Sequence, residues 1–291
     1  MTSPRTAQAA AAPVDRAERI ERIRQAAYRI RRNALDMGEV QGQGYIGQAL
    51  GVADVLAVVY TDQLRYRPED PHWPDRDRFL LSIGHYAIAA YAALAEAGTI
   101  PLEELETYGS DDSRLPMSAM ASYTPGMEIS GGSLGHGLGV ATGMALGLRH
   151  QGNPARVYDL LSDGELDEGS TWEAAMACAH HGLDHVTAIV DVNALQADGP
   201  TAGVLRTEPV TDKWRAFGWH ALRVDGNDVA ALVDAFDEVR EHRGSPSVLI
   251  CDTRIGSGVP MLENREKAHF MRVDEHEWQL ARTQLQEGLA R

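Results

Sequence analysis

Two polar clusters follow apolar runs that have the length of β-strands. The cluster Ser162-Asp163-Gly164-Glu165 follows residues 157–161, and Asn193-Ala194-Leu195 follows residues 186–192. Asp163 offers a carboxylate, Asn193 offers an amide oxygen, and the turn after Asn193 can direct a backbone carbonyl. These oxygen ligands suit a hard cation such as Mg²⁺. The alternative interpretation is a pair of ordinary turns that cap a helix and close a strand.

The elements that must position these clusters alternate between helix and strand. Beyond residue 134 the apolar pattern predicts helix 134–149, strand 157–161, helix 171–180, strand 186–192, strand 220–224, helix 229–240 and strand 247–252. Strands separated by helices imply right-handed crossovers and an α/β fold, a parallel sheet with helices on both faces. Ligands of such sheets bind at the carboxyl edge, which is where both clusters fall.

The first half of the chain is predicted to be mainly helical. Apolar residues at three-and-four spacing predict an amphipathic helix over 15–37, followed by helix 52–63, a short strand over 78–83 and helix 85–97. Three prolines exclude regular structure between residues 67 and 75, and residues 108–132 form a long loop. We expect residues 15–291 to form a single domain after a mobile tail, residues 1–14, that is not a signal peptide.

Composition excludes several classes of protein. Of 291 residues, 44% are hydrophobic and 24% charged, which fits a globular chain. Lys+Arg total 27 against Asp+Glu 42, a net charge of -15, so no basic surface is expected for nucleic acid or an anionic membrane. No apolar run reaches the roughly 18 residues of a membrane span. Only Cys178 and Cys251 are present, which fits a reducing cytoplasm.

Several motifs resemble those of the transketolase family. Asp163-Gly164-Glu165, with Asn193 thirty residues past Asp163, is similar to the family's thiamin diphosphate motif, which opens with Gly-Asp-Gly and closes with Asn. Ser82-Ile83-Gly84-His85 is similar to Ser-x-Gly-His, and residues 132–137 are similar to Gly-Ser/Pro-Leu-Gly-Gln-Gly. Shorter matches lie at residues 75–79, 172–176 and 263–264. The resemblance implies the thiamin diphosphate-binding fold, with that cofactor and Mg²⁺ as its ligands.

The resemblance also implies roles for the residues around the cation and the diphosphate. Asp163, the Asn193 side chain and the Leu195 carbonyl would bind Mg²⁺. Gly164 would let the diphosphate approach the backbone closely. Glu165 resembles a buried acid that connects cofactor sites across the assembly.

Other residues are matched to the organic part of the cofactor and to the substrate. Gly132 and Leu134 would contact the aminopyrimidine side, Leu134 through its backbone. His85 resembles a histidine that faces the substrate and helps to stabilise the reaction intermediate, and His269 resembles a second active-site histidine. Taken alone, a histidine after a glycine at a helix start is more often a cap or a packed residue.

The resemblance covers only the N-terminal, diphosphate-binding portion of the family. Single-chain transketolases continue into a pyrimidine-binding domain and a further C-terminal domain, for which 291 residues leave no room. The chain therefore resembles the first subunit of a split, two-chain transketolase, whose partner carries the pyrimidine-binding domain and its glutamate. We expect two copies of each subunit, α2β2, and no activity from this chain alone.

Four departures from the family pattern affect the expected substrate. Tyr45 and Ser118 stand where the family usually has substrate-facing histidines, His136 stands in place of Gln, and Ser162 in place of the first Gly of the cofactor motif. The cation and cofactor residues are retained. Because a polar site discriminates through its pairing with substrate hydroxyls, loss of two imidazoles should favour a different donor or acceptor.

Weaker patterns carry no function. Gly42-x-Gly44-x-x-Gly47 has dinucleotide-motif spacing but follows a predicted helix where a strand is required. His180, His181 and His185 are interpreted as a solvated helix end and not a zinc site. Cys178 is interpreted as a small core residue and not a nucleophile.

The predicted activity is transfer of a two-carbon ketol unit from a ketose donor to an aldehyde acceptor, in which the cofactor supplies the electron sink. Two alternatives stay open. One is two-carbon acyl transfer from an α-keto acid such as pyruvate, which Tyr45 and Ser118 favour. The other is a non-catalytic binding or regulatory subunit, against which the retained Asp163 and Asn193 argue.

Overall fold

The computed structural model describes residues 15–263, 265 and 268–289. The predicted tail, residues 1–14, lies outside the described residues, as does Asn264 of the motif at 263–264. Within the described part of the chain, no helix combines the length and the apolar character needed to cross a bilayer.

A five-stranded parallel sheet lies at the centre of the fold. Its strands are β2 (Arg78–Leu81), β3 (Val157–Ser162), β4 (Val186–Val192), β7 (His220–Asp225) and β8 (Ser247–Asp252). Their spatial order is β2-β3-β4-β8-β7, and all four neighbouring pairs are parallel. The prediction of an α/β fold with a parallel sheet is confirmed.

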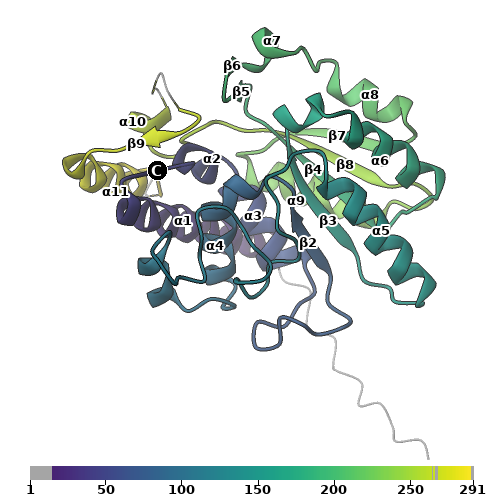
Figure 1. The fold of residues 1–291 in the computed structure, drawn as a ribbon, viewed down its shortest axis with the longest axis horizontal. Helices are drawn as coiled ribbons and strands as arrows, with labels where there is room; N and C mark the ends of the chain where they lie inside the picture. The colour runs from purple at the N-terminus through teal and green to yellow at the C-terminus, as the bar shows by residue number, and fades with distance from the viewer. Residues whose placement is uncertain (1–14, 264, 266–267, 290–291) are drawn as a thin grey trace, which may run out of the picture.

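Helices cover both faces of this sheet (Figure 1). One layer contains α1 (Arg16–Gln41), α3 (Ala53–Val58), α4 (Ala87–Glu96) and α9 (Val229–Glu241), and the other contains α5 (Gly137–His150), α6 (Gly169–His180) and α8 (Val210–Ala216). Successive strand residues alternate between the layers: Leu160 and Ile189 join the first apolar cluster, whereas Leu161 and Val190 join the second. This alternation explains why the strands read as nearly continuous apolar runs.

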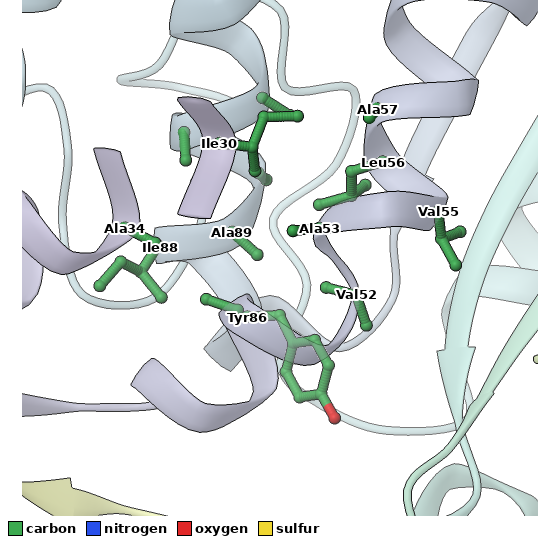
Figure 2. Close-up of a cluster of buried hydrophobic side chains, with 14 of the residues drawn as sticks. Ile30, Ala34, Val52, Ala53, Val55, Leu56, Ala57, Tyr86, Ile88 and Ala89 are labelled. Atoms are coloured by element: carbon green, nitrogen blue, oxygen red, sulfur yellow. The ribbon is translucent and has the colours of Figure 1, made fainter. Parts of the chain in front are cut away.

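The layer around α1 and α4 forms a tight apolar core beside the sheet. Figure 2 shows Ile30, Leu56 and Ile88 among its buried side chains, with Tyr86 at one edge and the Tyr86 hydroxyl pointing away from the cluster. Tyr86 is only 1% exposed. The core therefore holds the tyrosine ring while its polar end faces another part of the molecule.

Several boundaries differ from the prediction. The strand predicted over 78–83 ends at Leu81, and the next helix starts with a 3-10 turn, Gly84–Tyr86, before α4. The helix predicted over 52–63 consists of α3 and a π-helical turn, Val59–Gln63, preceded by α2 (Ile46–Gly51). Short apolar runs with internal glycines do not show these changes of helix type in their spacing.

Further elements escaped the prediction. They are β1 (Gln43–Gly44), a 3-10 helix (Leu102–Thr107), a 3-10 turn (Gly164–Asp167), β5 (Leu195–Gln196), β6 (Gly199–Pro200), α7 (Thr201–Val204), α8, α10 (Pro260–Glu263), β9 (Met271–Arg272) and α11 (Glu275–Leu289). Most are two to seven residues long, too short for a period to emerge. The pairing of β1 with β9 joins the first and last parts of the chain.

The long loop over residues 108–132 packs against the carboxyl end of β2. The Ala119 N–H donates to the Gly84 carbonyl (3.0 Å), and the Gly132 N–H donates to the Ser82 carbonyl (2.9 Å). A Cβ placed on Gly131 would lie 2.1 Å from the Leu81 carbonyl oxygen. Only glycine allows this approach of two backbones, which places the loop beside His85.

We expect Gly131→Ala to destabilise the chain by about 1–3 kcal/mol, because the added methyl group overlaps rigid backbone. Gly139→Ala is the matched control, since Gly139 lies in α5 with no heavy atom within 4 Å of an added Cβ. That change should stabilise the chain by about 0.5–1 kcal/mol. Urea unfolding measures both, and equal stability of the two variants would contradict the close contact.

Candidate active site

The carboxyl ends of β3 and β4 lie side by side. Ser162 on β3 is in register with Asp191 on β4, and the Asp163 N–H donates to the Asp191 carbonyl (2.9 Å). Asp163 and Asn193 therefore leave adjacent strands at one edge of the sheet. His85 follows β2 at the same edge, so three neighbouring strands contribute to one site.

Asp163 is a buried carboxylate that only neutral donors contact. The Gly164 N–H donates to Oδ1 (3.0 Å), and the Ala194 N–H (3.0 Å) and the Thr201 hydroxyl (2.7 Å) donate to Oδ2. Burial raises the pKa of Asp163 to about 6, although these hydrogen bonds act in the opposite direction. No Lys, Arg or His of the described residues forms an ion pair with it. A divalent cation would supply the missing positive charge.

The turn after Asn193 has an unusual backbone conformation. Ala194 has a φ of 62°, a left-handed conformation that is uncommon for residues other than glycine. Its N–H donates to Asp163, and its carbonyl accepts a hydrogen bond from the Thr201 N–H (3.0 Å). The Asn193 side-chain oxygen accepts from the Leu195 N–H (3.0 Å) and retains a lone pair for a ligand.

The residues present therefore fit a small hard cation. The predicted set contains one carboxylate, one amide oxygen and one carbonyl, which matches the few protein oxygens that Mg²⁺ takes when phosphate and water complete its shell. Across the described ranges, no group of three or more His, Cys, Asp or Glu side chains is arranged to hold a metal ion. A site made only of protein side chains, such as a zinc site, is not found there.

A buried polar network that the sequence analysis missed supports Asn193. The Tyr86 hydroxyl donates to Asp191 Oδ2 (2.7 Å), and the Asn193 side-chain nitrogen donates to both Asp191 Oδ2 (2.8 Å) and the Tyr86 oxygen (2.9 Å). The Thr253 hydroxyl donates to the other Asp191 oxygen. Burial raises the pKa of Asp191, and the three donated hydrogen bonds oppose that rise. An acid inside the apolar run of β4 was the detectable sign of this network.

His85 and His269 lie in one aromatic cluster, although 184 positions separate them in the chain. Their ring centroids are 6.0 Å apart, and Tyr45 contacts both at 4.7 and 5.5 Å. Phe270 lies 5.2 Å from the Tyr45 ring and is 40% exposed. The Gln48 side chain donates to the His269 carbonyl (2.6 Å). The structure thus brings the two predicted histidines together, and the pairing of β1 with β9 holds Tyr45 beside them.

Both imidazoles favour the neutral form. Burial, with a smaller contribution from His269, lowers the pKa of His85 to about 4. Burial also lowers the pKa of His269, while a hydrogen bond with the Leu195 backbone acts in the opposite direction. Neutral rings can donate at one nitrogen and accept at the other, which suits hydrogen bonding to hydroxyl and carbonyl groups.

The two positions that depart from the family's histidines both lie at this site. Tyr45 packs on His85, and the exposed Ser118 precedes Ala119, whose N–H donates to the Gly84 carbonyl next to His85. Ser118 also lies near Gly132, where an added Cβ would be 3.3 Å from its hydroxyl oxygen. These replacements therefore change the wall of the site and not a remote surface.

Glu165 is a second buried acid near the site. The Ser82 hydroxyl and the Gly135 N–H (2.7 Å) both donate to its Oε1, and Oε2 has no partner among the described residues. Burial raises the pKa of Glu165 to about 7, so it can hold a proton near neutral pH. Asp159 on β3 is fully buried, and neither of its carboxylate oxygens has a hydrogen-bond partner among the described residues. Burial, with a smaller contribution from the Glu165 charge, raises the pKa of Asp159 well above its usual value.

The remaining predicted contacts lie on the loop that precedes α5. Gly132 is exposed with a φ of 117°, and Leu134 is half-buried against the first apolar cluster. Gly164 lies next to Gln196, whose Cγ would be 3.3 Å from an added Cβ. The described hydrogen bonds of Asp163 come from Gly164, Ala194 and Thr201, so the assignment of Gly132 and Leu134 to the aminopyrimidine stays a prediction.

A cavity of about 840 Å³ lies apart from this cluster. It is bounded by residues of α1, α11 and the turns after β7 and β8, and Arg31 is paired with Asp54 at its wall. No predicted cofactor or metal residue lines it.

Comparisons with known proteins identify relatives of this chain. A family model described as "Transketolase, thiamine diphosphate binding domain" matches residues 23–288. A transketolase family protein of Sinorhizobium fredii is 66% identical over 253 residues, which cover 87% of this chain and 91% of that protein. The 6-deoxy-6-sulfo-D-fructose transketolase subunit of a Clostridium species is 39% identical over 245 residues, or 84% of this chain and 89% of that one.

Solved structures show the same fold. The transketolase of Campylobacter jejuni superimposes with a TM-score of 0.84 at 29% identity, over 92% of this chain. The match covers only 42% of that transketolase, so the chain spans less than half the length of the solved enzyme. By contrast, it spans nearly all of the Clostridium subunit.

We expect the His85 imidazole to stay neutral as the pH falls from 7 to about 5, because its folded-state pKa is about 4 and its unfolded value 6.5. The folded chain then binds fewer protons than the unfolded chain, so this residue lowers stability by up to about 1.4 kcal/mol per pH unit as pH falls between those values. NMR titration of the His85 ring-carbon resonance, which the His85→Asn variant assigns, measures the folded-state pKa. A midpoint near about 6.5, the value of a free imidazole, would contradict the burial.

Proposed function

The chain belongs to the transketolase family of thiamin diphosphate-binding domains, and we propose that it is one subunit of a two-chain transferase. That enzyme moves a two-carbon ketol unit from a ketose donor to an aldehyde acceptor. The observation that carries the proposal is the buried Asp163 carboxylate, which lies beside Asn193 on adjacent strand tips without a cationic partner among the described residues. A cation bound to a diphosphate group is the partner that this arrangement fits.

We assign the cation as Mg²⁺, held by Asp163, the Asn193 side-chain oxygen and the Leu195 carbonyl. The spare lone pair on the Asn193 oxygen and the fixed turn at Ala194 support this assignment. Gly164 and Glu165 follow Asp163 in the turn after β3, and we assign Gly164 to close approach of the diphosphate. Thiamin diphosphate, when bound, supplies the electron sink that ketol transfer requires.

The histidine cluster is assigned to the substrate. His85 and His269 offer neutral imidazoles that can bind hydroxyl or carbonyl groups of the donor, and His85 would act on the reaction intermediate. Tyr45 presents an aromatic face where the family usually has an imidazole. We therefore propose a donor or acceptor that makes fewer hydrogen bonds at this wall than the usual sugar phosphates do.

We propose that a second subunit completes the site. The match to less than half of a single-chain transketolase supports a partner with the pyrimidine-binding domain, as does the name of the Clostridium relative, a transketolase subunit. Gly132 and Leu134 would meet the aminopyrimidine at that junction, and the proton-holding Glu165 would link sites across an α2β2 assembly. The free thiols of Cys178 and Cys251 support a cytoplasmic location.

Reconstitution tests the proposed reaction. The full chain with an affinity tag should co-purify a partner that carries a pyrimidine-binding domain, and only the pair should be active with thiamin diphosphate and Mg²⁺. The expected product from ketose phosphates is an aldose, with no CO₂ released from pyruvate. CO₂ release without aldose formation would establish acyl transfer, and a pair that binds no cofactor would establish a non-catalytic subunit.

Asp163→Asn tests the cation site. The neutral side chain should weaken Mg²⁺ binding in the presence of thiamin diphosphate by more than the roughly 10–100-fold typical of an outer-shell partner. Asp225→Asn is the matched control, because exposed Asp225 ends β7 at the same edge of the sheet, away from the cluster. Calorimetry on the reconstituted pair measures both. Equal affinities for the two variants would remove Asp163 from the site.

A further inference from the structure

Tyr86 lies between the apolar core and the candidate active site. Its ring is buried at the edge of the cluster in Figure 2, and its hydroxyl points away from that cluster. The same residue follows His85 directly, and the two rings meet edge to face with centroids 4.8 Å apart. One side chain therefore contacts a substrate-facing histidine through its ring and the Asn193 amide through its hydroxyl.

The hydrogen bonds around Tyr86 determine which way the Asn193 amide faces. The Tyr86 hydroxyl donates its one hydrogen to Asp191 Oδ2 (2.7 Å), so the Tyr86 oxygen can only accept any further hydrogen bond. The Asn193 nitrogen donates to both of these oxygens, at 2.8 and 2.9 Å. A reversed amide would place its own oxygen against two acceptors and lose both hydrogen bonds.

With the nitrogen directed inward, the Asn193 oxygen is left on the opposite side, where the Leu195 N–H reaches it at 3.0 Å. That oxygen is the atom assigned above to the cation. We propose that Tyr86 is a positioning residue which, with Asp191, locks the Asn193 amide so that its oxygen faces Mg²⁺; this inference rests on the proposed function. Its ring also packs edge to face against His85.

The choice of cation makes this role measurable. Mg²⁺ demands near-ideal octahedral geometry at about 2.0–2.1 Å, whereas Ca²⁺ accepts flexible geometry at about 2.3–2.6 Å. An Asn193 amide that can rotate should therefore harm Mg²⁺ binding more than Ca²⁺ binding. A residue that only stabilises the fold would weaken both cations alike.

Tyr86→Phe keeps the ring in the core and beside His85 and removes only the hydroxyl. Calorimetric titration of MgCl₂ and of CaCl₂ into the full chain with its partner and thiamin diphosphate should show about 10-fold weaker Mg²⁺ binding, in the range for outer-shell partners. The Ca²⁺ affinity should fall less, so the Ca²⁺ to Mg²⁺ affinity ratio rises. At saturating Mg²⁺, kcat should return toward the wild-type value while the apparent KM for Mg²⁺ stays raised.

Tyr91→Phe is the matched control. Tyr91 is also fully buried, and its hydroxyl donates to the Pro116 carbonyl (3.0 Å), away from Asn193. Both variants should lose similar thermal stability without metal, but only Tyr86→Phe should change the cation ratio. An unchanged ratio in Tyr86→Phe, with normal binding by the wild-type protein, overturns the positioning role alone. Failure of the wild-type protein to bind Mg²⁺ and thiamin diphosphate overturns the proposed function first.

Discussion

The parallel register of β3 on β4 is the constraint on which the site depends. It places Ser162 opposite Asp191, so the residues that follow each strand emerge together with Asp163 and Asn193 in reach of one ligand. The Ala194 N–H, in the turn after Asn193, donates to Asp163 and links the two strand ends. Both strands are buried on both faces, so a one-residue slip in register would exchange the side chains that pack into the two apolar layers as well as separate the two oxygens.

The sheet was predictable because its strands are apolar runs separated by helices, a pattern that admits few topologies. All five strands and the helices α4, α5, α6 and α9 lie where the pattern placed them, within a few residues, whereas α7 and α8 between β4 and β7 were not predicted. The predictions failed where tertiary contacts decide the local structure. The segment 46–63 is mostly apolar, so no period could show the change from α2 to α3 or the π-helical turn. No element was predicted over residues 275–289, where α11 lies.

The candidate site was predictable in part. Asp163 and Asn193 could be placed at one edge of the sheet from the strand pattern alone. The proximity of His85 to His269 could be predicted only from the family resemblance, because these two histidines lie far apart in the chain. The partners of Asn193 were not found, since Tyr86 reads as one more apolar helix residue and Asp191 as an anomaly inside a strand. Side chains that act through other side chains leave no spacing rule in a sequence.

The left-handed backbone at Ala194 has a consequence for ligand binding. A non-glycine residue in this conformation costs on the order of 1–3 kcal/mol, and here hydrogen bonds to Asp163 and from Thr201 hold it. That cost is met during folding, so the Leu195 carbonyl and the Asn193 oxygen, which we propose as cation ligands, would have little reorganisation left to undergo on binding. The turn is thus preorganised, and a more relaxed residue at this position would trade ligand affinity for ease of folding.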